Sequence, residues 1–155
     1  MTELHDCHVL DWRIYAVHGT LIGERRHPAN NDHNNCTVRA LADCFGIHLI
    51  HAYEHNKRFG RRHRCAMRNS RWKHAALEMA KERGLYMRRL GTIKAQREYG
   101  KTVRTAQRAV LPHQRVIFNQ PKHTMGWANG VTSDWADGRR KHIQGVWEFL
   151  PREAA

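Results

Sequence analysis

The dipeptide Asn129-Gly130 lies between two short segments whose residues favour extended backbone. In this setting Asn-Gly is the strongest short-range signal for a two-residue hairpin, because both central residues of the favoured turn need positive φ. The turn places Ala128 opposite Val131. Side-chain alternation then puts His123 and Asp134 on the same face of the hairpin, as diagonal neighbours. A carboxylate there can orient the imidazole, whereas the alternative is an ordinary half-exposed hairpin whose polar side chains face solvent.

A second feature is the stretch that leads into Cys36. Its apolar residues recur at helical spacing and predict an amphipathic helix over about 35–45: Val38, Leu41, Ala42 and Phe45. Asn34 or Asn35 is a natural N-cap, so Cys36 is expected in the first turn, beside unpaired backbone N–H groups and the positive end of the helix dipole. That position favours the thiolate. Cys44, late in the same helix, is interpreted as a packing residue.

The order of the expected elements indicates the fold class. Helices are expected at about 35–45, 47–57, 70–83 and 101–110, and strands at about 9–17, 114–119, 122–128, 131–135 and 144–150. This is an α+β order, with N-terminal helices packed on a C-terminal antiparallel sheet and a cleft between them. The 155 residues fit a single domain, 1–155, in which residues 1–27 form an N-terminal extension that contains the first expected strand.

Several short motifs, in a fixed order, resemble one known protein family. Residues 35–42, NCTVRALA, are similar to the N-D-C-x-V-R-A-L-A opening of small papain-like cysteine peptidase-like proteins found mainly in bacteriophages. The segment from His123 through Asn129-Gly130 to Asp134 resembles the family's H-x-x-x-x-x-N-G-x-x-x-D-x-W element, and residues 140–147 resemble its closing R-K-V-x-x-x-W element. The resemblance covers about residues 28–150. Asn35 stands where the motif has Asp, and either residue can cap a helix.

The resemblance implies a papain-like fold and a division of roles at one site. Cys36 would attack a carbonyl as thiolate, His123 would hold the proton and return it to the leaving group, and Asp134 would fix the imidazole tautomer. The backbone N–H of Cys36 would supply one donor to the oxyanion. A side-chain amide shortly before the nucleophile commonly supplies another in papain-like enzymes, and Asn30 is the first choice and Asn31 the second. Both are equally plausible as plain loop residues.

The charge balance points to anionic partners. The chain has 27 Lys and Arg against 14 Asp and Glu, which gives a formal net charge of +13. Such a balance favours nucleic acid or an acidic protein surface, although any single cluster can be a solvated face. The candidate nucleic-acid-binding residues are Arg61, Arg62, Arg64, Arg139, Arg140 and Lys141.

The sequence also bears on location and cofactors. No apolar run approaches the roughly 20 residues that span a bilayer, and the N-terminus lacks the pattern of a signal peptide, so no membrane partner is expected. Four Cys without a regular framework fit reduced thiols in a cytoplasm, that of the host cell if the protein is phage-encoded. No C-x-x-C occurs, and the pair His51 and His55 lacks the H-E-x-x-H context, so neither a metal nor another cofactor is expected.

Two functions from different classes follow. The first is a cysteine hydrolase, either a peptidase or a related acyl transferase, that acts on a protein or peptide substrate. The second is a basic phage protein that binds nucleic acid or an acidic host protein on a papain-like scaffold without catalysis. The three chemistry-bearing residues favour the first, and the net charge of +13 favours the second.

Overall fold

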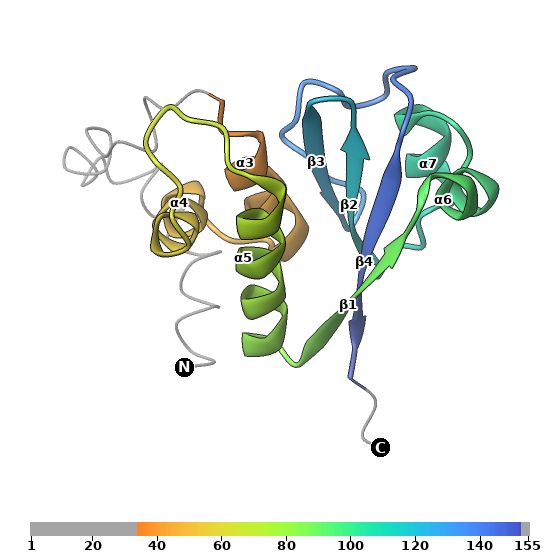
Figure 1. The fold of residues 1–155 in the computed structure, drawn as a ribbon. Helices are drawn as coiled ribbons and strands as arrows, with labels where there is room; N and C mark the ends of the chain where they lie inside the picture. Colours follow the sequence, from red (N-terminus) through yellow and green to blue (C-terminus); the bar gives the residue numbers. More distant parts are fainter. Residues whose placement is uncertain (1–33, 153–155) are drawn as a thin grey trace, which may run out of the picture.

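The computed structural model describes residues 34–152, which form an α+β fold (Figure 1). This part of the chain contains five α-helices and a four-stranded antiparallel sheet. The helices are α3 (Cys36–Phe45), α4 (Leu49–Arg58), α5 (Asn69–Glu82), α6 (Thr92–Tyr99) and α7 (Val103–Ala109). The strands are β1 (Leu85–Leu90), β2 (Arg115–Gln120), β3 (His123–Ala128) and β4 (Gly145–Pro151). No helix within residues 34–152 is long and apolar enough to cross a bilayer.

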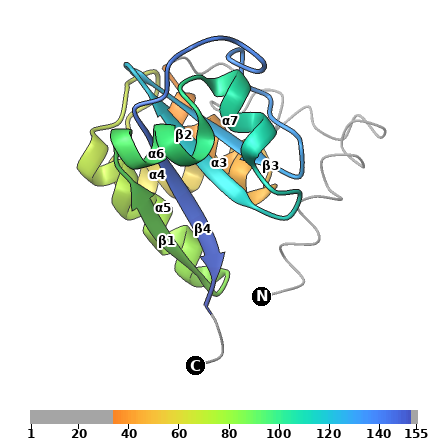
Figure 2. The same cartoon turned by 90° about the vertical axis from the view of Figure 1, so that its right-hand side faces the viewer.

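The sheet is the middle layer of three. Its strand order is β1-β4-β2-β3, and each neighbouring pair is antiparallel. On one face α3, α4 and α5 pack against Ile117 and Trp147, and on the other α6 and α7 pack against Val116 and Val146 (Figure 2). Because side chains alternate along a strand, β2 and β4 contribute to both cores. These two central strands therefore hold the two helical layers together.

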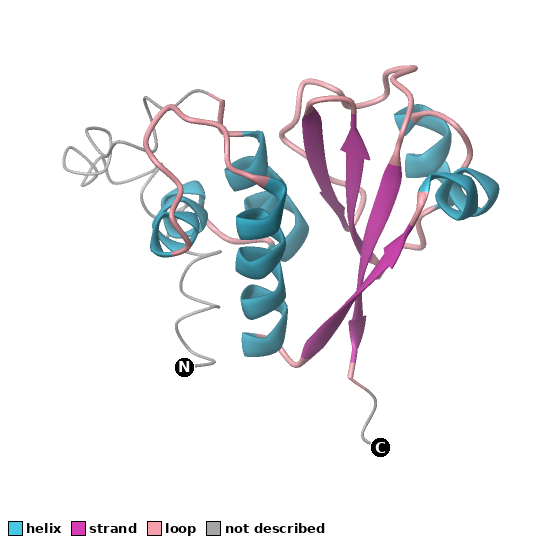
Figure 3. Ribbon diagram, in the orientation of Figure 1, coloured by secondary structure: helices cyan, strands magenta, loops and turns pink. Residues whose placement is uncertain are grey.

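The α+β class and the position of the first helices before the sheet are as predicted (Figure 3). The four expected helices correspond to α3, α4, α5 and α7. Strand β1 and helix α6 were not predicted. Because β1 precedes α6 and α7 in the chain, the sheet is not wholly C-terminal. The expected strand at 131–135 is wrong, because only Val131 pairs, with Ala128, and residues 132–138 form loop and turns. The expected strand at 9–17 and the extension 1–27 lie outside the described residues.

Helix α3 lies directly against β3 because Gly126 has no side chain. A Cβ at Gly126 would overlap the carbonyl oxygen of Ala40 and lie 2.9 Å from the backbone nitrogen of Cys44. A glycine inside a strand commonly marks such a close approach of another backbone. The helix side of this contact is packed with fully buried residues, among them Leu41 and Cys44.

Substitution of Gly126 by alanine should therefore destabilise the fold. The added methyl group meets helix backbone rather than a side chain that can move, so we expect the free energy of unfolding to fall by at least about 2 kcal/mol in urea denaturation. Gly91 is the matched control, because a Cβ there meets nothing within 4 Å and its φ of −66° suits alanine. Equal effects of the two substitutions would contradict this account of the α3 contact.

Candidate active site

Cys36 is the first residue of α3, as the sequence predicts. Asn35 occupies the N-cap position, but its side chain makes no capping hydrogen bond and instead accepts one from Arg39 Nε at 3.3 Å. The first turn of α3 also contains no acidic residue. The first backbone N–H groups of a helix lack intrahelical partners and carry partial positive charge. A thiolate at Cys36 is thus the anion that the beginning of α3 is placed to stabilise.

His123 and Asp134 form a close pair. His123 Nε2 lies 2.8 Å from Asp134 Oδ1 and 2.9 Å from Oδ2. The side chain of Asp134 is 2% exposed and that of His123 is 12% exposed, so water screens the pair weakly. Asp134 Oδ1 also accepts a hydrogen bond from the backbone N–H of Ala136 at 2.8 Å, which fixes the carboxylate. With Nε2 held by the carboxylate, Nδ1 is the ring nitrogen left to serve Cys36.

The pKa values of the thiol and the imidazole move in opposite directions. Burial raises the pKa of Cys36, but hydrogen bonds with His123 and Thr124 outweigh it, and the net pKa lies below its ordinary value. Burial alone would lower the pKa of His123, yet hydrogen bonds and charge interactions with Asp134 and Cys36 raise it to about 9. Both changes favour a thiolate beside an imidazolium. Such a pair combines an activated nucleophile with a proton donor.

The turn at Asn129-Gly130 forms as predicted, although the strand after it does not. Asn129 and Gly130 have φ values of 52° and 74°, and Ala128 and Val131 exchange two backbone hydrogen bonds of 3.0 and 3.3 Å. Asp134 therefore reaches His123 from a loop rather than from a paired strand.

Asp43, on α3, holds that loop in place. Its Oδ2 accepts hydrogen bonds from Thr132 Oγ1 at 3.1 Å and from the backbone N–H and hydroxyl of Ser133, each at 2.9 Å. Thr132 Oγ1 in turn accepts from the backbone N–H of Asp134 at 3.2 Å. Burial raises the pKa of Asp43, and the three donated hydrogen bonds oppose that rise. One helix thus carries Cys36 and also anchors the segment that carries Asp134.

Removal of this anchor should disturb the imidazole. With Asp43→Ala the loop loses three hydrogen bonds, so we expect the free energy of unfolding to fall by about 1–3 kcal/mol. We also expect the pKa of His123 to fall from about 9, because Asp134 loses its fixed position, and an NMR titration of the histidine ring measures it. Asp43→Asn keeps an amide oxygen as acceptor and should change both quantities less. An unchanged pKa of His123 in Asp43→Ala would limit Asp43 to a structural role.

Trp135 covers the imidazole. Its ring centroid lies 4.8 Å from that of His123, and the residue is 55% exposed. Arg139 and Lys141 lie over the Trp135 ring at 5.8 and 5.1 Å from its centroid. The sequence analysis missed the contact of Trp135 with His123 and the hydrogen bonds of Asp43 to the loop, because no local pattern indicates either.

The predicted basic residues fall into two groups. Arg139, Arg140 and Lys141 follow Asp134 in the chain and are exposed, as are Arg62 and Arg64 beyond α4. The predicted surface role of Arg61 is corrected, because this residue is only 5% exposed. Its side chain donates to the carbonyl oxygen of Asn34 at 3.3 Å and lies over the ring of Tyr53. Its guanidinium thus joins the start of the described chain to α4 rather than presenting a surface charge.

The Cys36 thiol opens onto a cleft of about 680 Å³. The cleft lies between α3, α5 and the sheet and is lined by Asn34, Cys36, Thr37, Ala66, Met67, Asn69, Trp72, Lys73, Arg89, Asn119, Gln120, Lys122, His123, Thr124, Gln144 and Trp147. The candidate oxyanion residues Asn30 and Asn31 lie outside the described residues. Gln120, opposite His123 in the register of β2 and β3, is a side-chain amide in the cleft that the sequence does not mark. Within residues 34–152 no three His, Cys, Asp or Glu side chains gather as metal ligands.

No protein-family model, curated protein or solved structure matches this chain. The site is therefore interpreted from its own geometry. That geometry joins a thiol with a lowered pKa and an imidazole with a raised pKa, which both line one cleft, with a buried carboxylate that holds the imidazole.

Proposed function

We propose that this protein is a papain-like cysteine hydrolase, either a peptidase or a related acyl transferase. One observation carries the proposal: the Cys36 thiol and the His123 imidazole line one cleft and shift each other's pKa, and Nε2 of the same imidazole is held by the buried Asp134. Exposed surface residues rarely share such an arrangement, and perturbed pKa values of this kind gather at functional sites. The resemblance of the sequence motifs to phage papain-like proteins supports the same function and suggests action in the cytoplasm of an infected bacterium.

The chemistry follows from the positions of the three groups. The Cys36 thiolate attacks the carbonyl carbon of an acyl substrate, and the carbonyl electrons move to oxygen to form a tetrahedral oxyanion. The backbone N–H of Cys36, at the beginning of α3, is one donor to that oxyanion. His123 gives its proton to the departing amine as the carbonyl reforms, which leaves a thioester on Cys36. Water, or an amine in the case of a transferase, then attacks the thioester while neutral His123 takes a proton from it. The carbonyl reforms, sulfur leaves as thiolate, and the thiolate and imidazolium pair is restored. Asp134 keeps the ring in the required orientation throughout.

The pH dependence of alkylation tests this proposal. Iodoacetamide reacts with thiolates, so Cys36 should already be alkylated rapidly at pH 6, where the imidazolium of His123 is fully formed below its pKa of about 9. In His123→Ala the pKa of the Cys36 thiol should rise. The alkylation rate of Cys36 at pH 6 should then fall at least about tenfold, because each unit by which this pKa rises lowers the thiolate fraction about tenfold. Peptide mass spectrometry reads Cys36 separately from the exposed Cys65, which is the internal control. Equal rates at Cys36 in both proteins would remove the proposed thiolate and imidazolium pair.

A basic binding protein without catalysis is the second candidate. The observation that favours it is the exposure of Arg62, Arg64, Arg139, Arg140 and Lys141 on a chain with a net charge of +13. It requires binding to DNA or RNA that weakens steeply with salt and that survives Cys36→Ala. Binding that does not change between low and moderate salt would argue against it.

A further inference from the structure

Cations line the cleft beside Cys36. Among the described residues Lys73, Arg89 and Lys122 belong to its wall, whereas no Asp or Glu of residues 34–152 does. Lys73 Nζ and the guanidinium of Arg89 lie over the ring of Trp147, at 5.3 and 5.6 Å from its centroid. Within residues 34–152 none of these three cations forms an ion pair with a carboxylate. The field in the cleft therefore favours an anionic ligand.

Buried hydrogen-bonding groups in the same wall also lack partners. Trp72 and Trp147 are 3% and 6% exposed, and neither indole N–H has an acceptor in the described part of the chain. Gln120 is 4% exposed, and both polar atoms of its amide are likewise unpartnered there. Buried polar groups in proteins are nearly always hydrogen-bonded, and an indole N–H can only donate. Carbonyl and carboxylate oxygens of a ligand are the groups that satisfy indole donors.

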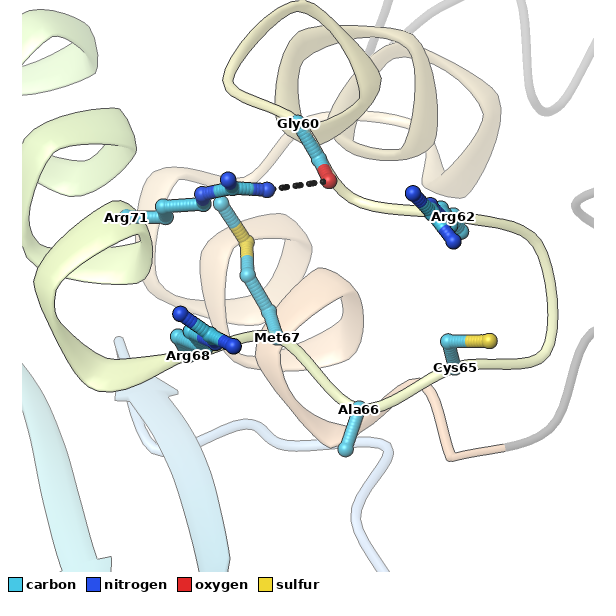
Figure 4. Close-up of a pocket in the computed structure, with 7 residues that line it drawn as sticks. All are labelled: Gly60, Arg62, Cys65, Ala66, Met67, Arg68 and Arg71. Atoms are coloured by element: carbon cyan, nitrogen blue, oxygen red, sulfur yellow. Dashed lines mark hydrogen bonds between the residues drawn. The ribbon is translucent and has the colours of Figure 1, made fainter.

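A second pocket is lined by the three arginines Arg62, Arg68 and Arg71 (Figure 4). It has a volume of about 330 Å³ and is lined by Gly60, Arg62, Cys65, Ala66, Met67, Arg68 and Arg71. Arg71 donates to the carbonyl oxygen of Gly60 at 3.2 Å, which holds one side of the pocket. Ala66 and Met67 line both hollows, so the arginine-lined pocket adjoins the Cys36 cleft. No carboxylate of residues 34–152 lines either hollow.

We infer that the substrate is an acidic polypeptide, which binds with its reacting carbonyl at Cys36 and its carboxylates along the cleft and across Ala66–Met67 into the arginine-lined pocket. This inference rests on the proposed function. Charge complementarity alone would suit nucleic acid as well. A thiolate paired with an imidazolium, however, forms a thioester from an acyl carbonyl, which a polypeptide offers and a phosphodiester backbone does not. The cations then select the sequence around the reacting carbonyl.

Matched peptide electrophiles test the inference. Three peptide vinyl sulfones of equal length, rich in Glu, Gln or Lys, alkylate Cys36 when the thiolate adds to the alkene and a proton moves to the adjacent carbon. We expect the Glu peptide to react at least about tenfold faster than the Gln peptide at low salt, and the Lys peptide to react slowest. In the double variant Arg62→Gln, Arg68→Gln the ratio of Glu to Gln rates should fall by more than half. The matched double variant Arg104→Gln, Arg108→Gln removes two exposed arginines of α7, on the other side of the sheet, and should keep the ratio.

The possible results separate the inference from the proposed function. If Cys36 reacts with all three peptides at similar rates, the inference is wrong and the hydrolase proposal stands. If Cys36 reacts neither with the peptides nor with iodoacetamide, both fail. An equal loss of the ratio in the two double variants would assign the preference to net charge and overturn the binding path. A ratio near one, together with strong protection of Cys36 by duplex DNA, would assign this face to nucleic acid.

Discussion

Replacement of Cys36 by alanine should abolish the burst of nitrophenolate that the wild-type protein releases from 4-nitrophenyl acetate. In the wild type the thiolate attacks the acetyl carbonyl, nitrophenolate leaves, and a thioester remains on sulfur until water removes it. Because deacylation is slower than acylation with such an activated ester, one nitrophenolate per active site should appear before the steady rate. Alanine has no nucleophile, so the burst amplitude should fall to zero rather than decrease by a factor.

The fold should survive this substitution. Cys36 is partly exposed at the beginning of α3, so loss of its sulfur removes little buried surface, and circular dichroism and urea denaturation should change only slightly. Cys65→Ala is the matched control. Cys65 is an exposed thiol that lines the adjoining pocket rather than the Cys36 cleft, and the small acetyl ester does not need that pocket, so the burst should remain intact. A burst of equal size in Cys36→Ala would exclude Cys36 as the nucleophile.

Replacement of Asp134 by asparagine should lower steady ester hydrolysis by about 100- to 10,000-fold. The amide has nearly the same shape but no negative charge, and it can donate to Nε2 and so select the wrong tautomer of His123. The raised pKa of His123 depends on hydrogen bonds and charge from Asp134 and Cys36, so it should fall from about 9 toward the ordinary histidine value. NMR titration of the ring and the pH profile of hydrolysis measure the two effects.

The raised pKa of His123 also determines how the loss of stability in Asp134→Asn depends on pH. A histidine whose pKa is higher in the folded state stabilises the fold most at low pH, and this contribution disappears as the pH rises through about 9. Asp134→Asn should therefore lose more stability near pH 6 than near pH 10. Asp137→Asn is the control, because the Asp137 carboxylate accepts from Gln107 at 2.7 Å instead of from His123. If Asp134→Asn keeps full activity and the raised pKa of His123, the carboxylate has no role in orienting the ring.

The parts of the fold that the sequence predicted are those with strong local signals. Helix α3 has an apolar face at regular spacing, and Asn129-Gly130 takes the two positive φ values that its residue types favour. Strand β1 lacked such a signal because it is an edge strand whose polar residues are mostly exposed, and Arg88 gains its partner, Glu148, only from β4. Helix α6 is similarly hidden, since Ala95 and Tyr99 are its only buried residues.

The site was predictable only in part, for a related reason. Alternation along a hairpin brings Asp134 to the side of His123, and the two residues do meet. The predicted conformation of the segment that carries Asp134 was wrong, because hydrogen bonds to Asp43 hold it as a loop where a strand was expected. Side-chain contacts across 90 residues of sequence leave no local pattern from which to predict such a loop. For Arg61 a local pattern was present but misleading. A run of basic residues indicates surface charge, whereas Arg61 in that run is buried.

The absence of a side chain at Gly126 reaches further than local packing. Ala40 lies four residues along α3 from Cys36, and Gly126 lies three residues along β3 from His123, so the contact between their backbones fixes how far the reacting sulfur stands from the ring. Proton transfer between these atoms tolerates little extra distance. A small widening at this point would therefore slow the reaction in molecules that remain folded, so variants at Gly126 would lose activity as well as stability.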